Sequence, residues 1–225
     1  RAWRSSSSMP FVVATGRSLH ATKMILRRWQ LPEPDAYIVD VGTRIVFPDG
    51  HGEWKECAEF AAYLDEGWDR AAVTRIIAPL RLKAQPRVTE GPYKISFFGT
   101  ARDAANIREI LSANGVAAKV IFSHGRLIDI LAPNGGKAEA IAAYARKFGL
   151  SLSNCVAAGD SGNDADMLAA CGHAIVVGNA AAELDDLPDR KGLIRVAKHH
   201  AAGVLEGLAL LDLCDGVASA VAAAA

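Results

Sequence analysis

The stretch from Cys155 to Ala170 constrains the fold most, because it predicts a strand, a tight loop and a helix in immediate succession. The apolar run Cys155–Ala158 is followed by the loop Gly159-Asp160-Ser161-Gly162-Asn163-Asp164 and by the helix-like stretch Ala165–Ala170. Two carboxylates and an amide thus follow the carboxyl end of a strand, where ligands bind in open α/β sheets. The loop suits a hard cation that takes one or two carboxylates and otherwise binds water and phosphate, as Mg²⁺ does.

This loop has two other interpretations. Clusters of Asp, Gly and Asn often form plain turns, because these residues tolerate left-handed backbone and cap helices. That alternative stays open for the loop taken alone. A calcium-binding EF-hand loop needs Gly at its sixth position and Glu at its twelfth. Ala165 and Cys171 occupy those positions, which excludes an EF-hand.

Composition narrows the class of protein. About half of the 225 residues are apolar, enough for a substantial core, and 25 basic residues balance 25 acidic ones. Nucleic acid and anionic membranes attract a basic excess, so neither is an expected partner. No apolar run approaches the ~20 residues of a membrane span, and no signal peptide is visible. The Ala-rich end, Val221–Ala225, is expected to fray.

The four cysteines form no CxxC pair, which argues against zinc. They are far apart in the sequence, and at least two lie in apolar runs typical of small core residues. Free thiols of this kind favour a reduced, cytoplasmic setting. The cysteines are Cys57, Cys155, Cys171 and Cys214.

Strand and helix patterns alternate at the start of the chain. Strands are expected at 11–14, 37–39 and 43–47, with a helix over 18–30 between the first two. Alternation of this kind predicts a parallel sheet with crossover helices. After Pro133 it returns, with helices at 137–148, 165–170 and 203–211 and strands at 155–158, 173–177 and 193–196.

The middle of the chain has a different pattern. Helices are expected around 53–66, 69–80 and 101–113, and strands at 93–98, 118–123 and 127–131. The last two strands are joined by His124-Gly125-Arg126, which predicts an antiparallel pair and hence an α+β unit. The expected fold class is therefore α/β, with a parallel-sheet core interrupted by an inserted α+β cap. The expected domains are a first core segment at 1–50, the cap at 51–132 and a second core segment at 133–225.

Two further segments suit a phosphate. Thr15-Gly16-Arg17 directly follows the first strand, and a hydroxyl with backbone amides at a helix N-terminus can bind an anion. Thr15 as a plain helix cap is the alternative. Lys137 begins a later helix after Gly135-Gly136 and could neutralise a phosphate, or could simply be solvated. A Walker A loop is excluded, because Leu131 replaces its first Gly and Ala138 its Ser/Thr.

These three segments are expected to converge at one end of the parallel sheet. Phosphoryl transfer needs positioning donors, a cation to offset developing charge and a bound metal, and the segments supply all three. The combination therefore predicts a phosphoryl-transfer site.

At these residues the chain resembles the haloacid dehalogenase (HAD) superfamily of phosphotransferases. Thr15-Gly16-Arg17 resembles its second motif, Lys137 its third and Gly159–Asp164 its fourth, and Gly178-Asn179-Ala180 matches the segment after the fourth. Nearly the whole chain is also similar to sucrose-6-phosphate phosphatases, including the phosphatase-like domains of sucrose-phosphate synthases. The stretches that carry this narrower similarity are Val13–Arg17, Leu31–Asp35, Val41–Thr43, Gly67–Arg70, Pro92–Ser96 and Ala202–Leu208.

The resemblance implies a HAD-like Rossmannoid core and a role for each matching residue. Asp160 would ligate Mg²⁺, and Asp164 would ligate it directly or hold its waters. Asn163 would orient phosphate or a carboxylate. Thr15 and the Gly16 amide would bind phosphate, with Lys137 as the counter-charge.

The resemblance also implies a substrate. Arg17 would reach it, and Lys94, on a cap strand, is a candidate sugar-binding residue. The cap would close over the core, exclude water and select the sugar. The implied reaction is Mg²⁺-dependent release of sucrose from sucrose 6-phosphate through an aspartyl-phosphate.

One departure from the family concerns the nucleophile. The family uses an Asp in a D-x-D motif on the first core strand, upstream of the residue that Thr15 resembles. No Asp or Glu precedes Thr15, and the first acidic residue is Glu33. Arg1–Arg4 and Ser5–Ser8 resemble a helix end and a loop that would follow such a strand. We therefore expect a truncated sequence lacking the first core strand, two unpaired strand edges in the core and no phosphatase activity in this chain alone.

Two other functions stay open. The absent nucleophile is also compatible with a non-catalytic, phosphatase-like domain of a sucrose-phosphate synthase. Such a domain would bind sugar phosphate or have a regulatory role through contact with the synthase. A third hypothesis keeps the enzyme and changes the substrate, for example to mannosyl-3-phosphoglycerate.

Overall fold

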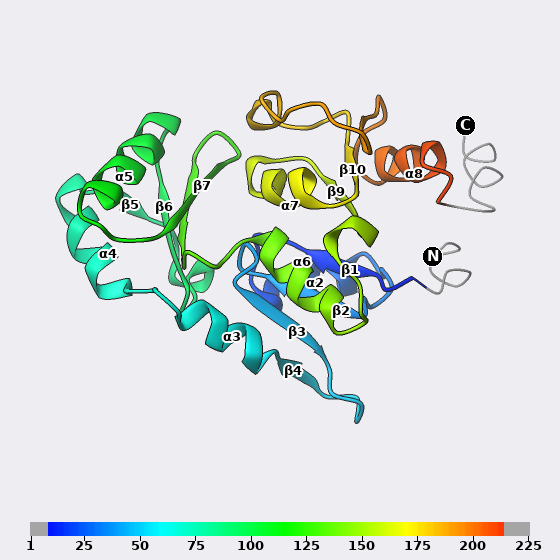
Figure 1. Cartoon of the computed structure of the whole chain (residues 1–225), viewed down its shortest axis with the longest axis horizontal. Helices are drawn as coiled ribbons and strands as arrows, with labels where there is room; N and C mark the ends of the chain where they lie inside the picture. The colour runs from blue at the N-terminus through cyan, green and yellow to red at the C-terminus, as the bar shows by residue number, and fades with distance from the viewer. Residues whose placement is uncertain (1–8, 214–225) are drawn as a thin grey trace.

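The computed structural model describes residues 9–213 and shows two lobes joined side by side (Figure 1). The core lobe contains two sheets and the cap lobe a third. The expected features of Arg1–Ser8, Cys214 and Val221–Ala225 lie outside the described residues. Short 3₁₀ turns interrupt the connections: η1 Ala78–Leu80, η2 Arg87–Thr89, η3 Leu152–Asn154, η4 Gly162–Asp164 and η5 Ala182–Leu184.

The first core sheet has the order β1 (Val12–Ala14), β2 (Ala36–Val39), β3 (Arg44–Pro48), β4 (Trp54–Glu56). Helix α2 (Leu19–Arg28) makes the crossover between the parallel strands β1 and β2. The rest of the sheet differs from the expected parallel pattern, since β2, β3 and β4 pair antiparallel. The connections after β2 and β3 are too short for a parallel crossover, which needs a dozen residues or more.

The second core sheet is parallel, with the order β11 (Leu193–Arg195), β10 (His173–Val176), β9 (Val156–Gly159). Helix α7 (Ala165–Ala170) packs on one face through Leu168, and α8 (His200–Leu210) on the other through Leu208. Helix α6 (Lys137–Arg146) packs on the first sheet through Ala140 and Tyr144. Helices thus cover both core sheets, as expected for an α/β fold.

The two core sheets end in open edges that face each other. Among the described strands, β1 pairs only with β2, and β9 only with β10. Ala14 of β1 packs against the apolar cluster that contains Ala157 of β9. All three residues of β1 are only partly buried, although the strand lies inside the core lobe. Within residues 9–213, the facing edges of β1 and β9 therefore have no strand partner, and the missing first core strand stays a prediction.

The cap sheet has the order β5 (Lys83–Ala84), β6 (Lys94–Phe98), β8 (Leu127–Leu131), β7 (Lys119–Ser123), and every pair is antiparallel. Helices α4 (Arg70–Ile77) and α5 (Ala101–Ala113) pack on it through Val73, Ile107 and Leu111. The cap therefore has its own apolar core, as expected for an inserted α+β unit.

The stretch at 54–65 joins the core lobe. A helix is expected over 53–66, but the structure forms β4 first and begins helix α3 (Ala58–Asp65) after Cys57. Trp54 packs its ring 4.7 Å from that of Tyr37, and Phe60 and Leu64 share a cluster with Ile38. We therefore propose that the cap begins near Gly67 rather than at residue 51.

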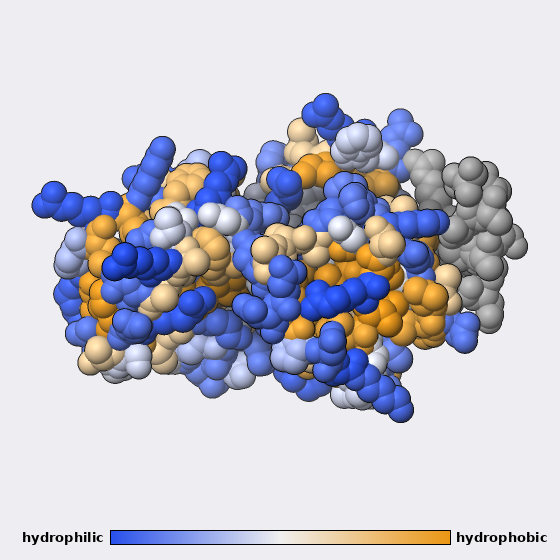
Figure 2. Space-filling view, turned by 90° about the horizontal axis from the view of Figure 1, so that it is seen from above, coloured by the Kyte–Doolittle hydropathy of each residue, from blue (hydrophilic) through white to orange (hydrophobic). Residues whose placement is uncertain are grey.

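Figure 2 shows the surface from above, with the largest apolar area of this view on the core lobe. Within residues 9–213, no helix has both the length and the apolar character needed to cross a membrane.

Candidate active site

Three loops meet where β1, β9 and α6 come together, and they carry the residues that the sequence singles out. Thr15 and Gly16 follow β1, the acidic loop 159–164 follows β9, and Lys137 is the first residue of α6. A Cβ built on Gly16 would lie 3.4 Å from Nδ2 of Asn163. The structure therefore brings the three predicted segments into one site.

Lys137 is the centre of this site. Its side chain is buried, and Nζ donates hydrogen bonds of 2.5 Å to Oδ1 of Asn163 and Oδ1 of Asp164. A buried ammonium is stable only with such charged and polar partners. The alternative of a solvated lysine is therefore wrong for Lys137.

Asp164 holds the acidic loop together. Its Oδ2 accepts hydrogen bonds of 3.0 Å from the amides of Asp160 and Ser161, and its Oδ1 pairs with Lys137. Asp164 is also buried. Both of its carboxylate oxygens are thus engaged by protein donors, which leaves it little capacity to ligate a metal directly.

Asp160 has the opposite character. Its carboxylate is partly exposed and makes no hydrogen bond or ion pair with any residue that the structure describes. One free carboxylate beside the Thr15–Gly16 loop fits Mg²⁺, which takes one or two carboxylates and completes its shell with water and phosphate. No group of three His, Cys, Asp or Glu side chains within residues 9–213 is arranged to hold a metal. The protein donors here therefore fit a Mg²⁺ shared with a phosphate rather than a metal enclosed by side chains.

The loop after β1 offers free donors. Thr15 Oγ1 accepts a 3.2 Å hydrogen bond from the Arg17 amide, which leaves the hydroxyl hydrogen free. Ser18, not Thr15, caps α2, because its side chain accepts from the amide of Ala21 at 3.4 Å. The side chain of Arg17 is exposed and has no partner among residues 9–213.

A strained turn positions Lys137, and the sequence pattern does not reveal it. Asp40, Val41 and Gly42 follow β2 with positive φ angles of 53°, 60° and 79°. The Gly42 carbonyl accepts a 3.2 Å hydrogen bond from the amide of Gly136, next to Lys137. A Cβ on Gly42 would collide with the backbone of Gly136 and Lys137. Three consecutive left-handed residues are rare and concentrate at functional sites.

A second polar group lies between cap and core. Lys94 on β6 is buried, with Nζ 3.8 Å from Oδ1 of Asp129 on β8, and Ser96 donates to the same oxygen at 2.6 Å. From the core side, burial raises the pKa of Asp40, and the charges of Lys94 and Arg44 oppose that rise. Asp40 Oδ1 is buried without a hydrogen-bond partner among residues 9–213. Sequence reasoning found Lys94 but missed Ser96, Asp129 and Asp40, which lie far apart in the sequence.

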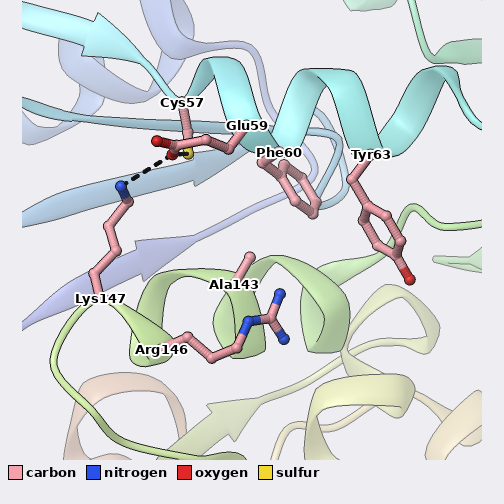
Figure 3. Close-up of a pocket in the computed structure, with 7 residues that line it drawn as sticks. All are labelled: Cys57, Glu59, Phe60, Tyr63, Ala143, Arg146 and Lys147. Carbon is pink, nitrogen blue, oxygen red and sulfur yellow. Dashed lines mark hydrogen bonds and ion pairs between the residues drawn. The ribbon is translucent and has the colours of Figure 1, made fainter.

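The hollow drawn in Figure 3 is separate from this site. It has a volume of about 330 Å³ and lies between α3 and α6, at the end of α6 remote from Lys137. In its wall, Lys147 and Glu59 form an ion pair of 3.2 Å at the surface. Burial raises the pKa of the Cys57 thiol beside them, which disfavours the reactive thiolate. We assign no chemistry to this hollow.

Comparison with known proteins gives these residues a context. The sucrose-phosphatase of Synechocystis sp. PCC6803, solved in complex with sucrose and phosphate, is 28% identical and has a TM-score of 0.82; the match covers 89% of this chain and 84% of that one. This likeness confirms the expected HAD-like α/β fold. HAD-like structures below 25% identity, such as yhjK of Bacillus subtilis with a TM-score of 0.64, share the fold.

Curated relatives agree with the structural match. Sucrose-phosphatase 1 of Nicotiana tabacum is 30% identical over 94% of this chain and 52% of its own length. Mannosylfructose-phosphate phosphatase of Agrobacterium fabrum is 30% identical over 88% of this chain and 81% of its length. The chain thus spans about half the length of the plant relatives that it matches. Residues 1–212 match the sucrose-6F-phosphate phosphohydrolase family, and the chain belongs to that family.

Proposed function

We propose that this chain is the sugar-phosphate-binding part of a Mg²⁺-dependent phosphatase that releases sucrose from sucrose 6-phosphate. The observation that carries the proposal is the buried Lys137 ammonium, held by Asn163 and Asp164 beside Thr15 and Gly16. A fixed positive charge beside a free hydroxyl and a glycine loop is what a transferring phosphoryl group needs.

Each residue has a proposed task. Thr15 and the Gly16 amide donate to phosphate oxygens, Lys137 offsets their charge, and Asn163 orients them. Asp160 would hold Mg²⁺, which when bound would neutralise further phosphate charge. Asp164 contributes by fixing the loop and Lys137, with any contact to the metal made through water.

The sugar would occupy the space between cap and core. Lys94, Ser96, Asp129 and Asp40 offer charged and polar groups suited to hydroxyls, and Asp40 Oδ1 lacks a partner among the described residues. Arg17, exposed and unpaired within the same range, would reach the substrate from the core side.

The attacking carboxylate would come from an additional strand with a D-x-D motif, paired between β1 and β9. Their two open edges support this proposal, since a central parallel strand has neighbours on both sides. Among the described carboxylates near Lys137, Asp164 is engaged by Lys137 and two loop amides, Asp166 accepts from the amides of Ala138 and Met167, and Asp160 is assigned to the metal. We therefore propose that this 225-residue chain alone does not hydrolyse sucrose 6-phosphate.

Ligand binding tests the site independently of turnover. Titration calorimetry of the chain with inorganic phosphate should show binding that strengthens with Mg²⁺. Asp160→Asn should abolish the Mg²⁺ effect, and Thr15→Val should weaken phosphate binding in both conditions. Unchanged binding in both variants would refute the assignment.

The Agrobacterium relative motivates a second candidate substrate, a mannosylfructose phosphate. A longer form that includes a D-x-D strand should be assayed with sucrose 6-phosphate, mannosylfructose phosphate and mannosyl-3-phosphoglycerate. Faster hydrolysis of sucrose 6-phosphate than of the other two compounds supports the proposal. Faster hydrolysis of one of the others would make that compound the proposed substrate instead. If no substrate turns over while phosphate still binds, the non-catalytic sugar-phosphate-binding domain is favoured.

Two wider proposals accompany this function. We propose a cytoplasmic location, supported by the free thiols of Cys57, Cys155 and Cys171. We also propose association with a sucrose-phosphate synthase, which co-purification of the two proteins would test.

A further inference from the structure

The tip of the cap hairpin between β7 and β8 reaches the core lobe. The Gly125 amide donates a 2.6 Å hydrogen bond to Oε1 of Glu183, in η5 of the core. The hydrogen bond that closes the hairpin turn comes from the Arg126 amide, which donates to the carbonyl of Ser123 at 3.2 Å. Glu183 is therefore the acceptor for the exposed Gly125 amide.

The same hairpin lies directly on the acidic loop. A Cβ built on Gly162 would collide with the carbonyl oxygen of Phe122 and would lie 3.2 Å from Cβ of Glu183. Gly162 therefore lies in the contact between the hairpin and the core, and a larger side chain would not fit there. The acidic loop is covered by the cap at this point.

Glu183 is connected to the proposed metal ligand. The Ala181 amide donates a 2.7 Å hydrogen bond to the carbonyl of Asp160, and Leu184 is fully buried in the β9–β10 core. Backbone and packing thus hold Glu183 in a fixed place relative to Asp160. A cap that rests on Glu183 is positioned relative to the metal and phosphate site.

The cap joins the core at the two linkers near 66–69 and 131–136. Asn134 Nδ2 donates to the carbonyl of Tyr63 at 3.0 Å, and Gly67 has a positive φ of 74°. Linkers that lie together and contain glycine are suited to a hinge. The Gly125–Glu183 hydrogen bond is a separate contact between cap and core, made by the hairpin tip and not by the linkers.

We propose that Glu183 is a positioning residue that latches the cap hairpin over the acidic loop, and that this latch opens to admit the sugar phosphate. The role rests on the proposed function, although the latch itself needs no ligand. A single charged hydrogen bond is strong enough to bias closure. The other oxygen, Oε2, is buried without a partner among the described residues, so the closed contact carries a desolvation cost.

Hydrogen exchange of the Gly125 amide, followed by NMR in the 225-residue chain, tests the latch. Glu183→Ala removes the acceptor, so exchange at Gly125 should accelerate by roughly tenfold or more, with β8 amides such as Ile130 unchanged. Glu183→Gln keeps an amide oxygen as acceptor and should retain most of the protection. Gly162→Ala should also accelerate exchange, because its methyl group pushes the Phe122 carbonyl away.

Asp186→Ala is the matched control, since it removes the same charge from an exposed residue three positions away. Unchanged exchange in Glu183→Ala, or equal acceleration in Asp186→Ala, would overturn the proposal. Exchange that accelerates at β8 as well would indicate cap unfolding and also count against a latch. If the latch behaves as expected while neither Mg²⁺ nor phosphate binds, the latch stands and the proposed function falls.

Discussion

At the scale of single residues, the surroundings of Lys137 combine stability and function. Its ammonium is buried and pairs with Asp164, whose carboxylate also accepts from two loop amides. Removing one partner of a buried pair leaves the other charge uncompensated, and this usually costs more than the pair itself contributes. The fold of the site therefore depends on Lys137, in addition to the phosphate binding proposed for it.

Lys137→Met should reduce the free energy of unfolding by about 3–5 kcal/mol. The matched control is Lys147→Met at the other end of α6, where the ion pair with Glu59 is exposed and worth at most about 1 kcal/mol. Urea denaturation of both variants measures the difference. Equal losses of unfolding free energy in the two variants would contradict the expected cost of leaving a buried charge without its partner.

Asp40 makes stability depend on pH. Burial raises the pKa of this carboxyl above its usual 3.8, so the folded state binds its proton more tightly than the unfolded state does. The penalty for ionising Asp40 is therefore full above the folded pKa and disappears as pH falls to 3.8. Asp40→Asn should be more stable than the parent at about pH 7, and this advantage should vanish as the carboxyl of the parent becomes protonated. Urea denaturation across that range checks it, and an advantage independent of pH would contradict the burial argument.

At the scale of elements, the left-handed turn at 40–42 sets the start of α6. Gly42 has φ +79° and no space for a Cβ against Gly136 and Lys137. Gly50 is its control, because it has φ +88° and open space around it. Gly50→Ala should cost about 1–2 kcal/mol from backbone strain alone. Gly42→Ala should lower the stability clearly more than Gly50→Ala does, and it should also weaken phosphate binding. Thermal unfolding measures the first effect and calorimetry the second. Equal losses of stability in the two variants would mean that the close approach of Gly42 to Gly136 and Lys137 is unimportant.

The elements also show what sequence patterns can predict. Helix α5 and the β7–β8 hairpin are confirmed, because apolar periodicity and turn residues mark them clearly. Strands β4 and β5 escape prediction, since two or three residues carry no period. The left-handed turn escapes it because Val41 is β-branched and such residues rarely adopt positive φ. Convergence is predictable for Thr15 and Asn163 from their places after strands and for Lys137 from its place at the start of a helix. The engagement of Asp164 depends on loop geometry.

At the scale of the whole molecule, the two core sheets form one lobe without a hydrogen-bonded strand pair between them in the described part of the chain. Ala14 packs across the junction, so apolar contact links β1 to the β9 side. Backbone groups on the facing edges of β1 and β9 have no strand partner among residues 9–213. Such edges are costly inside a core and accept a further strand readily.

A form of the protein that carries a D-x-D strand between β1 and β9 should therefore gain stability and, under the proposed function, activity by separable routes. Hydrogen exchange at the β1 and β9 edges should slow once the strand pairs with both, and phosphate release from sucrose 6-phosphate should appear. Replacing both carboxylates of the motif by Asn should keep the slow exchange and abolish phosphate release, because pairing uses the backbone and attack uses the carboxylate. Activity in the 225-residue chain, or edge exchange unaffected by the added strand, would contradict this division of the site.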